Sequence, residues 1–542
     1  MPDAIVVGGG HNGLVCACYL ARVGLDVLVL EGADYYGGAV HTRESFPGFR
    51  FDTCSVAHNM INMTDILEEL ELRDCGLEYR EMDPFTTSMR PDGRILRFYR
   101  SVERTCEEIA RVAPEDAEGY RRFIARADPL VEAGLVAFSG GYPRRLSAGA
   151  MAAFRRGLYT TGVDVLAPYG RLLAATFQSE AVRAPLAALA AHATVGPDSP
   201  GGSLFVLWQA AYHRYGMWHA RGGSGMLAKA LARRLRSLGG RIRTGAAVQW
   251  ILVNDGQVRG VELTDGERIE SKRIAAAIHP KTALLRLIGR EYLSPALTQR
   301  LEAVRTSNAV QYVIHVPLEA LPVYRGLDAL PGDPRDVFNG MQTVAATVEH
   351  VASGFRAAAL GLAPAEPAVY AFTPSALDTT LAPPDRHTLY LACPSYPARL
   401  AEGSWSERGR PEAERLLAAL AAAAPGLRAS GDSLSLWTPD DMEREIGLEG
   451  AHPMHVDLSI DQLGPLRPLP ELADHRTPIR GLYLAAAGSS PTGGVSGVPG
   501  RAAARAIVAD TERGRGRRWW LAGAAASAGA AGWLWSRRTG RR

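Results

Sequence analysis

Residues 4–31 of this 542-residue chain read AIVVGGGHNGLVCACYLARVGLDVLVLE, and this stretch decides the fold. A short run of apolar, mostly β-branched residues stops at glycines, which is typical of a buried strand that enters a turn. Residues 16–25 then have helical spacing, and DVLVLE repeats the pattern of a buried strand. The stretch therefore predicts a strand–helix–strand unit of an α/β fold.

The glycines at the turn have the spacing of a dinucleotide-binding loop. Gly8, Gly10 and Gly13 form the pattern G-x-G-x-x-G. The first glycine permits the tight turn, the second lets the backbone approach a pyrophosphate, and the third lets the helix pack on the strand. The start of the helix offers amide donors to the phosphates. Glu31 ends the second strand, where its carboxylate can accept hydrogen bonds from ribose hydroxyls. These residues predict a bound dinucleotide.

Two further glycines favour FAD over NAD. Gly37 and Gly38 follow Glu31 in the pattern E-x5-G-G, which resembles the extended FAD fingerprint of flavoprotein oxidases and desaturases. Because glycine has no side chain, it lets the backbone of a loop pass close to the cofactor. A separate NADPH domain would need a second fingerprint, and the later candidate ARGGSGML at 220–227 follows no strand-like run. The sequence therefore predicts FAD.

The composition is that of a large globular protein. Apolar residues make up 47% and charged residues 22% of the chain, which excludes disorder of the whole chain. The net charge of +3 gives no global field that attracts nucleic acid, so no nucleic-acid partner is expected. The six cysteines form no C-x-x-C pair, which argues against a redox dithiol or a structural metal. The start of the chain lacks a signal-peptide pattern, so a cytoplasmic location is expected.

The patterns along the chain predict two interleaved domains and a tail. Residues 50–220 are rich in helical patterns, whereas 239–278 alternate β-branched residues with turns typical of a meander. Residues 476–488 read as a strand that enters a glycine-rich turn, and 500–510 as a helix. The prediction is an α/β protein with a Rossmann-like, glutathione-reductase-like FAD-binding domain from 1–75, 220–285 and 476–511, an α+β substrate domain from 76–219 and 286–475, and a C-terminal hydrophobic helix within a tail at 512–542.

Several stretches resemble the phytoene-desaturase-like family of FAD-dependent oxidoreductases, which contains carotenoid desaturases, carotene isomerases and retinol saturases. The N-terminal stretch, PGFRFD at 47–52 and RGGSGMLAKAL at 221–231 carry the likeness. The block at 447–504 is especially similar to the branch that contains pyridine nucleotide-disulfide oxidoreductase domain-containing protein 2, which lacks a redox disulfide motif as this chain does. The resemblance covers residues 1 to about 510 in order and does not reach the tail.

The resemblance implies a position for FAD along the chain. It implies that the glycine turn holds the pyrophosphate, that Glu31 binds the adenosine ribose and that Val248 meets adenine through its backbone. Gly488, Gly494 and Val495 would lie at the isoalloxazine, and the following helix would point at the N1/O2 edge of the flavin. The complete set of predicted cofactor residues is Gly8, Gly10, Gly13, Glu31, Gly37, Gly38, Val248, Gly488, Gly494 and Val495.

The chain departs from the family in the turn before the last helix. The usual T-H-P-G-G-G reads SSPTGG here, at 489–494, so a histidine and a glycine are missing near the flavin. Binding should survive because Gly493, Gly494 and Gly497 remain, but a catalytic role for that histidine does not carry over. The covalent flavin attachment of monoamine oxidases needs a cysteine in this turn, and the turn has none. Noncovalent FAD is therefore expected.

The chemistry expected from this resemblance takes place at the flavin N5, which accepts or gives a hydride while the protein binds, aligns and excludes water. Candidate catalytic groups in the pocket are His213, Tyr215, Arg221 and His455, and a satisfied structural hydrogen bond is the alternative for each. His452 and His455 are three residues apart, as metal ligands can be, but no third ligand accompanies them in the sequence. No metal site is therefore expected.

Three functions are compatible with these residues. The first is an oxidoreductase that desaturates, saturates, isomerises or cyclises a lipophilic polyene, isoprenoid or polyketide chain. The second is a flavin amine oxidase. Such enzymes usually place a lysine near N5, and this chain has only Lys229, Lys272 and Lys281. Lys229 falls in a surface-like helical pattern and Lys272 beside a turn, which makes this function the weaker one. The third is a flavoprotein scaffold without turnover, since the C-terminal turn is altered.

The tail contains RRWWLAGAAASAGAAGWLWSRR at 517–538, an uncharged stretch bounded by tryptophans and arginines. As a helix, 519–535 spans about 24 Å, short of the roughly 30 Å hydrocarbon layer. Tryptophans at both ends favour a helix that spans or dips into the bilayer, and a disordered extension is the alternative. Gly523, Ser527 and Ala531 would let two helices pair as a homodimer. The tail thus predicts contact with membrane lipid, at the inner face of a membrane.

Overall fold

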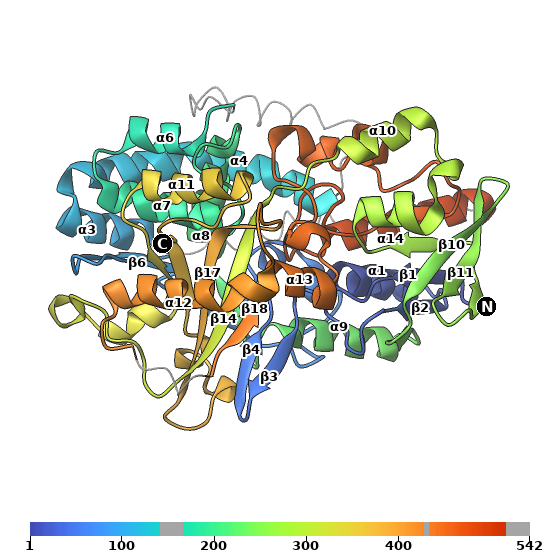
Figure 1. Cartoon of the computed structure of the whole chain (residues 1–542). Coiled ribbons are helices and arrows are strands. Elements are labelled where there is room, and N and C mark those ends of the chain that lie inside the picture. The colour runs from blue at the N-terminus through green and yellow to red at the C-terminus, as the bar shows by residue number, and fades with distance from the viewer. Residues whose placement is uncertain (141–165, 428–432, 516–542) are drawn as a thin grey trace, which may run out of the picture.

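The computed structural model describes residues 1–140, 166–427 and 433–515, and the predicted strand–helix–strand unit is part of a five-stranded parallel sheet (Figure 1). Strand β1 (Ala4–Val7) pairs in parallel with β2 (Val27–Leu30), and helix α1 (His11–Arg22) connects them. The predicted α/β fold is thereby confirmed. The strand order is β19-β13-β1-β2-β9, and the three further strands are β9 (Arg241–Arg243), β13 (Ile274–Ala276) and β19 (Leu482–Leu484).

Helices cover one face of this sheet. Alternate residues of β1 and β2 point to this face, where Val6 and Val29 join a buried core with Leu14 of α1, Leu231 and Ile507. Helices α1 and α14 approach closely at Gly500, where a Cβ would lie only 2.0 Å from the carbonyl oxygen of Asn12. Glycine, which has no Cβ, permits this approach. The helices on this face are α1, α9 (Gly225–Ser237) and α14 (Val498–Arg515).

A three-stranded antiparallel sheet covers the other face. Ile5 and Val7 of β1 pack there with Val258 and Val261. Asp255 and Gly256 make the first turn with positive φ angles of 52° and 65°, as the Asp-Gly turn signal predicts. The predicted meander is confirmed. Its strands are β10 (Val248–Asn254), β11 (Gln257–Leu263) and β12 (Arg268–Glu270).

A second large sheet, mixed and of seven strands, lies beside the parallel sheet in Figure 1. Its strands pair antiparallel except β15 with β6, which are parallel. The strand order is β18 (Ser435–Trp437), β14 (Ala309–Leu318), β17 (His387–Pro397), β16 (Val369–Phe372), β15 (Met341–Val344), β6 (Thr86–Met89) and β7 (Ile95–Phe98).

Helices pack on both faces of the mixed sheet. Tyr370 and Phe372 of β16 face a core with a group of six helices, whereas Val369 and Ala371 face a core with α12. This alternation is the two-residue period of a strand buried on both faces. The first core includes α3 (Val102–Val112), α4 (Ala117–Gly140), α6 (Tyr169–Thr176), α7 (Glu180–His192), α8 (Val206–Tyr215) and α11 (Val348–Ala359), and the second contains α12 (Trp405–Ala423).

The second glycine motif follows a strand that its sequence pattern did not predict, but it is not part of a second dinucleotide-binding unit. The motif at 220–227 follows a short strand, β8, which pairs antiparallel with β5 and is not part of the parallel sheet. The glycines therefore do not form a second dinucleotide loop. The remaining elements are β3 (Thr42–Phe46), β4 (Phe49–Asp52), α2 (Ile66–Glu69), β5 (Tyr79–Glu81), β8 (Trp218–Ala220), α10 (Pro295–Ala303) and α13 (Pro439–Ile446).

This motif instead builds a buried polar cluster around Asp52. Oδ1 of Asp52 accepts hydrogen bonds from Thr42 Oγ1 at 2.6 Å and from the Ser224 amide at 2.7 Å. A Cβ on Gly223 would lie 2.5 Å from Thr42 Oγ1, so the chain can approach the cluster only as glycine. Burial raises the pKa of Asp52 to about 6. The folded protein therefore holds a proton on this carboxyl group that the unfolded chain releases near pH 4.

Replacing Asp52 by asparagine is expected to flatten the pH dependence of stability. In the wild type, the stabilisation from protonated Asp52 is complete below pH ~4 and is lost as the pH rises to about 6, which lowers the free energy of unfolding by about 2–3 kcal/mol. Urea unfolding at several pH values measures this slope. Asp255→Asn, at an exposed turn with positive φ, is the control and should keep the wild-type slope. An unchanged slope in Asp52→Asn would contradict the assignment.

The membrane prediction for the tail concerns residues outside the described part of the chain. The predicted apolar stretch at 517–538 falls within 516–542, which the structure does not describe. Among the helices of 1–140, 166–427 and 433–515, none combines the length and the apolar character needed to cross a bilayer. The described part of α14 ends at Arg515, before the tryptophans begin.

Candidate active site

A first cavity, of about 340 Å³, lies where β1 and β2 end and α1 begins. The glycine loop, Glu31 at the end of β2 and Val248 at the start of β10 line one part of it. Ala486 and Ala487, which follow β19, line another part. Open parallel sheets bind ligands beyond the carboxyl ends of their strands, which is where this cavity lies.

The three fingerprint glycines shape the loop in different ways. Gly8 has a φ of 102°, and a Cβ there would lie 2.8 Å from the carbonyl oxygen of Ala277. A Cβ on Gly13 would lie 2.1 Å from the carbonyl oxygen of Gly8, so glycine lets α1 pack against β1. A Cβ on Gly10 would meet no atom within 4 Å, and Gly10 lines the cavity. The loop therefore presents bare backbone to the space that a pyrophosphate would occupy.

Glu31 and the second glycine pair fix the shape of this loop. Glu31 accepts hydrogen bonds from the amides of Gly9, at 2.7 Å, and Ala33, at 3.0 Å. The amide of Gly37 donates to the carbonyl oxygen of Gly9 at 2.9 Å, and Gly38 lines the cavity. A carboxylate has further lone pairs, so Glu31 can still accept from ribose hydroxyls. The residues present thus fit the adenosine and pyrophosphate parts of FAD.

His11 joins this loop to the C-terminal turn. Its Nε2 lies 3.2 Å from the carbonyl oxygen of Gly494, and burial lowers the pKa of His11 to about 4. The ring is therefore neutral at physiological pH, and its Nε2–H donates to that oxygen. Val495 lies beside Gly494 at the second cavity, whereas Gly488 packs against Pro280 and lines neither cavity. His11 gave no signal in the sequence except its place between Gly10 and Gly13.

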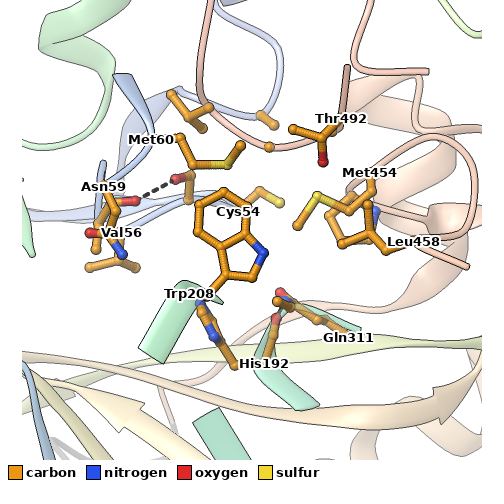
Figure 2. Close-up of a pocket in the computed structure, with 18 of the residues that line it drawn as sticks. Cys54, Val56, Asn59, Met60, His192, Trp208, Gln311, Met454, Leu458 and Thr492 are labelled. Atoms are coloured by element: carbon orange, nitrogen blue, oxygen red, sulfur yellow. Dashed lines mark hydrogen bonds between the residues drawn. The ribbon is translucent and has the colours of Figure 1, made fainter. Parts of the chain in front are cut away.

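A second cavity, of about 150 Å³, adjoins the first, because His11, Ala39 and Pro453 line both. Aromatic rings and thioethers dominate its wall. Figure 2 shows the indole of Trp208 in the middle of this group, with Met60 and Thr492 on one side and His192 and Gln311 on the other. The aromatic and sulfur-containing residues of the lining are Cys54, Met60, Phe205, Trp208, Tyr212, Tyr370, Phe372, Tyr390 and Met454.

The wall of the second cavity carries no formal charge at neutral pH. No aspartate, glutamate, lysine or arginine of the described ranges lines it. Burial lowers the pKa of both His11 and His192, so both rings are neutral. Burial also raises the pKa of Cys54 to about 12, which keeps it a thiol. The cavity therefore suits an uncharged, largely apolar ligand.

Three of the four predicted catalytic residues lie away from both cavities. His213 Nε2 pairs with the hydroxyl of Tyr120 at 2.7 Å, and its Nδ1 faces the carbonyl oxygen of Arg100 at 3.1 Å. Arg221 pairs with Glu78 at the surface at 3.3 Å. The carbonyl oxygen of Tyr215 accepts from the indole of Trp218, at 2.7 Å. The structure thus gives His213, Tyr215 and Arg221 partners in the surrounding fold.

His455 is the predicted catalytic residue that lines a cavity. It borders the first cavity, and its ring stacks on His279 with centroids 5.8 Å apart. The carbonyl oxygen of His455 accepts from His279 Nε2 at 3.0 Å, and burial lowers the pKa of His455 well below its usual value. His452 faces Asp457 at 3.6 Å instead. Within the described ranges, no three histidine, cysteine or acidic side chains gather in a group that could hold a metal ion.

A buried arginine holds the segment around His455 in place. Arg467 is fully buried, and its guanidinium donates hydrogen bonds at 2.5 to 3.2 Å to five backbone carbonyl oxygens. These hydrogen bonds connect the segment that lines the cavities to the end of β19. The acceptors belong to Met454, Val456, Asp457, Gln462 and Ala487.

Comparisons with known proteins agree with this arrangement. The model of the family described as flavin containing amine oxidoreductase matches residues 13–316. The chain is 32% identical to pyridine nucleotide-disulfide oxidoreductase domain-containing protein 2 of Mus musculus, over 94% of this chain and 93% of that protein. It is 27% identical to a lycopene-forming phytoene desaturase of Paracoccus sp., over 93% and 96% of the two chains.

The solved structures show the same fold. A mutant of putrescine oxidase, made in a redesign of its cofactor binding, superposes with a TM-score of 0.60 over 94% of this chain and 99% of that chain, at 17% identity. The resemblance found in the sequence motifs is thereby confirmed at the level of family and fold. This chain belongs to the flavin containing amine oxidoreductase family, which implies FAD as its cofactor.

Proposed function

We propose that this protein is an FAD-dependent oxidoreductase that acts on a lipophilic polyene, isoprenoid or polyketide-type chain. The observation that carries the proposal is the second cavity, which is uncharged, lined by aromatic and thioether side chains, and adjoins the first cavity at His11. When bound, FAD supplies a hydride acceptor or donor at its N5 atom. The residues of the cavity bind the chain, align it and exclude water.

The C-terminal turn would hold the flavin without a covalent bond. The turn has no cysteine, and Cys54, which lines the second cavity with the turn, is a neutral thiol because burial raises its pKa to about 12. A thiol is a poor nucleophile compared with a thiolate. Acid precipitation of the protein should therefore release all of its flavin into the supernatant.

An amine oxidase is the second candidate, because the matching family model is named for amine oxidoreductases. None of the three lysines, all of which the structure describes, lines either cavity. Lys281 donates to the carbonyl oxygen of Glu302, Lys229 lines a separate crevice near Tyr36, and Lys272 follows β12. The wall of the second cavity also lacks a carboxylate that could balance an ammonium group. These observations favour the lipophilic substrate.

Anaerobic titration of the flavin-loaded protein tests the proposal. A polyene or isoprenoid is expected to bleach the oxidised flavin, or to reoxidise the reduced flavin if the enzyme saturates its substrate. An amine with a carbon skeleton of the same size should do neither. Bleaching by the amine alone would establish the amine oxidase, and no change with either ligand class would favour the scaffold without turnover.

We propose further that the tail brings the active site to the bilayer. Full-length protein is expected to sediment with membranes at low and at high salt, whereas a variant that lacks residues 516–542 should stay in the supernatant with the same flavin content. Removal leaves the described part of α14 intact, including the pair of Asp510 with Arg476 at 2.9 Å. Equal amounts of both proteins in the supernatant would contradict the proposal. Crosslinking of the membrane-bound protein would test the expected homodimer.

A further inference from the structure

His192 and Gln311 form a polar corner of the second cavity. His192 is the last residue of α7, and Gln311 lies on β14. The side-chain Nε2 of Gln311 donates to the backbone carbonyl oxygen of His192 at 2.9 Å, so the two residues are adjacent. Figure 2 shows both side chains on the side of the cavity opposite Met60 and Thr492. The corner therefore lies across the cavity from the C-terminal turn.

The tautomer of His192 follows from its neighbour. Its Nδ1 lies 2.9 Å from the carbonyl oxygen of Leu189, which can only accept, so Nδ1 carries the hydrogen. Burial lowers the pKa of His192, so the ring is neutral and Nε2 keeps its lone pair. The ring is held edge-to-face on Tyr370, with centroids 5.9 Å apart. His192 thus presents a hydrogen-bond acceptor in a fixed direction.

The orientation of the Gln311 amide is fixed in the same way. Because its nitrogen donates to a carbonyl oxygen, Oε1 is the remaining acceptor of the side chain. Neither Gln311 Oε1 nor His192 Nε2 has a hydrogen-bond partner among the described residues. Gln311 is 8% exposed, His192 is partly exposed, and both line the cavity, so these acceptors face its interior. A ligand that fills this corner therefore pairs with an acceptor there only if it carries a donor.

We infer that the second cavity takes a lipophilic molecule whose polar group is a neutral hydroxyl, which donates to His192 Nε2 or Gln311 Oε1. This inference rests on the proposed function and narrows its substrate class. An ammonium group would also donate, but the wall has no carboxylate to balance its charge. A pure hydrocarbon would leave both acceptors desolvated and unpaired. A carboxylate could accept only the second amide hydrogen of Gln311, and no cation in the wall would balance its charge.

Ligand binding to the full-length, flavin-loaded protein tests this inference. Geraniol, the hydrocarbon of the same skeleton, its aldehyde and its amine are titrated anaerobically, and binding is read from the perturbation of the flavin spectrum. We expect geraniol to bind at least about tenfold more tightly than the other three ligands. In Gln311→Leu and in His192→Phe, which keeps a flat ring against Tyr370, this preference should fall by about tenfold or vanish. Met454→Leu, an apolar change in the same wall, should leave the preference intact.

The outcomes separate this inference from the proposed function. If the lipophilic ligands bind without preference for the alcohol, or if both variants keep the wild-type preference, the hydroxyl site is wrong and the proposed function stands. Equal binding of the aldehyde would mean that the ligand accepts the second amide hydrogen of Gln311 and does not donate to either acceptor, which would likewise overturn the hydroxyl site. If no lipophilic ligand perturbs the flavin spectrum of a properly folded holoprotein, both the inference and the proposed function fail. Melting temperature and flavin content establish that each variant is folded.

Discussion

The Gly10→Ala variant is expected to fold normally and to lose its flavin. Gly10 has a φ of −67°, which alanine adopts without strain, and its added methyl group meets no protein atom within 4 Å. That methyl group would instead project into the first cavity, where the pyrophosphate must contact the backbone. We expect flavin affinity to fall at least about tenfold, equivalent to about 1.4 kcal/mol, while the melting temperature of the apoprotein is unchanged.

Flavin content after desalting, together with thermal melting, measures this effect. Gly13→Ala is the informative comparison because its Cβ would lie 2.1 Å from the carbonyl oxygen of Gly8, so both the fold and the flavin should be lost. Gly134→Ala, within α4 and with no atom within 4 Å, should change neither. If Gly10→Ala binds flavin with the affinity of the wild type, the first cavity is not the site of the pyrophosphate.

The Arg467→Met variant is expected to lose about 3–5 kcal/mol of stability. The methionine fills much of the volume but donates no hydrogen bond, so five buried carbonyl oxygens lose their charged partner. The segment that contains Met454 and His455 lines both cavities, so flavin should also dissociate more easily. The stability of Arg467→Lys should lie between that of the wild type and that of Arg467→Met, because one ammonium group reaches fewer carbonyl oxygens than a guanidinium does.

Urea unfolding and the rate of flavin release measure these two effects. Arg268→Met is the control, because the side chain of Arg268 is 70% exposed and its ion pair with Glu262 is at the surface. Surface ion pairs contribute about 1 kcal/mol or less. A loss of stability in Arg467→Met as small as in this control would mean that the buried guanidinium does not hold the segment in place.

The parts of the fold that local sequence determines were predictable. The strand–helix–strand unit and the meander have short-range signals, namely glycine spacing, apolar periodicity and Asp-Gly turns. The structure brings Gly8, Gly10, Glu31, Gly38 and Val248 to the wall of one cavity, as expected of residues that hold one ligand. The cofactor roles of these residues stay predictions until flavin binding is measured.

The second cavity could not be predicted, because its residues come together only through long-range packing. Tyr370 lies in the buried strand β16 and Tyr390 in the buried strand β17, and the sequences of these strands do not mark either residue as part of a ligand site. His192 and Gln311 are 119 residues apart in the chain. The sequence offers His213 as a candidate polar group of the pocket, with a structural hydrogen bond as the alternative, and in the fold its Nε2 pairs with the hydroxyl of Tyr120. Residue type alone does not distinguish a histidine that lines a cavity, such as His192, from one that is paired within the fold, such as His213.

The discontinuous parallel sheet has a consequence for biosynthesis. Its edge strand β19 is residues 482–484, and the hydrogen bond between His11 and Gly494 spans 483 residues of chain. A ribosome makes the glycine loop first and the C-terminal turn last, so a nascent chain carries only part of the flavin site. The wall of the flavin site is therefore complete only after nearly the whole chain has emerged, and until then β1 and β2 lack part of the packing that buries their apolar faces.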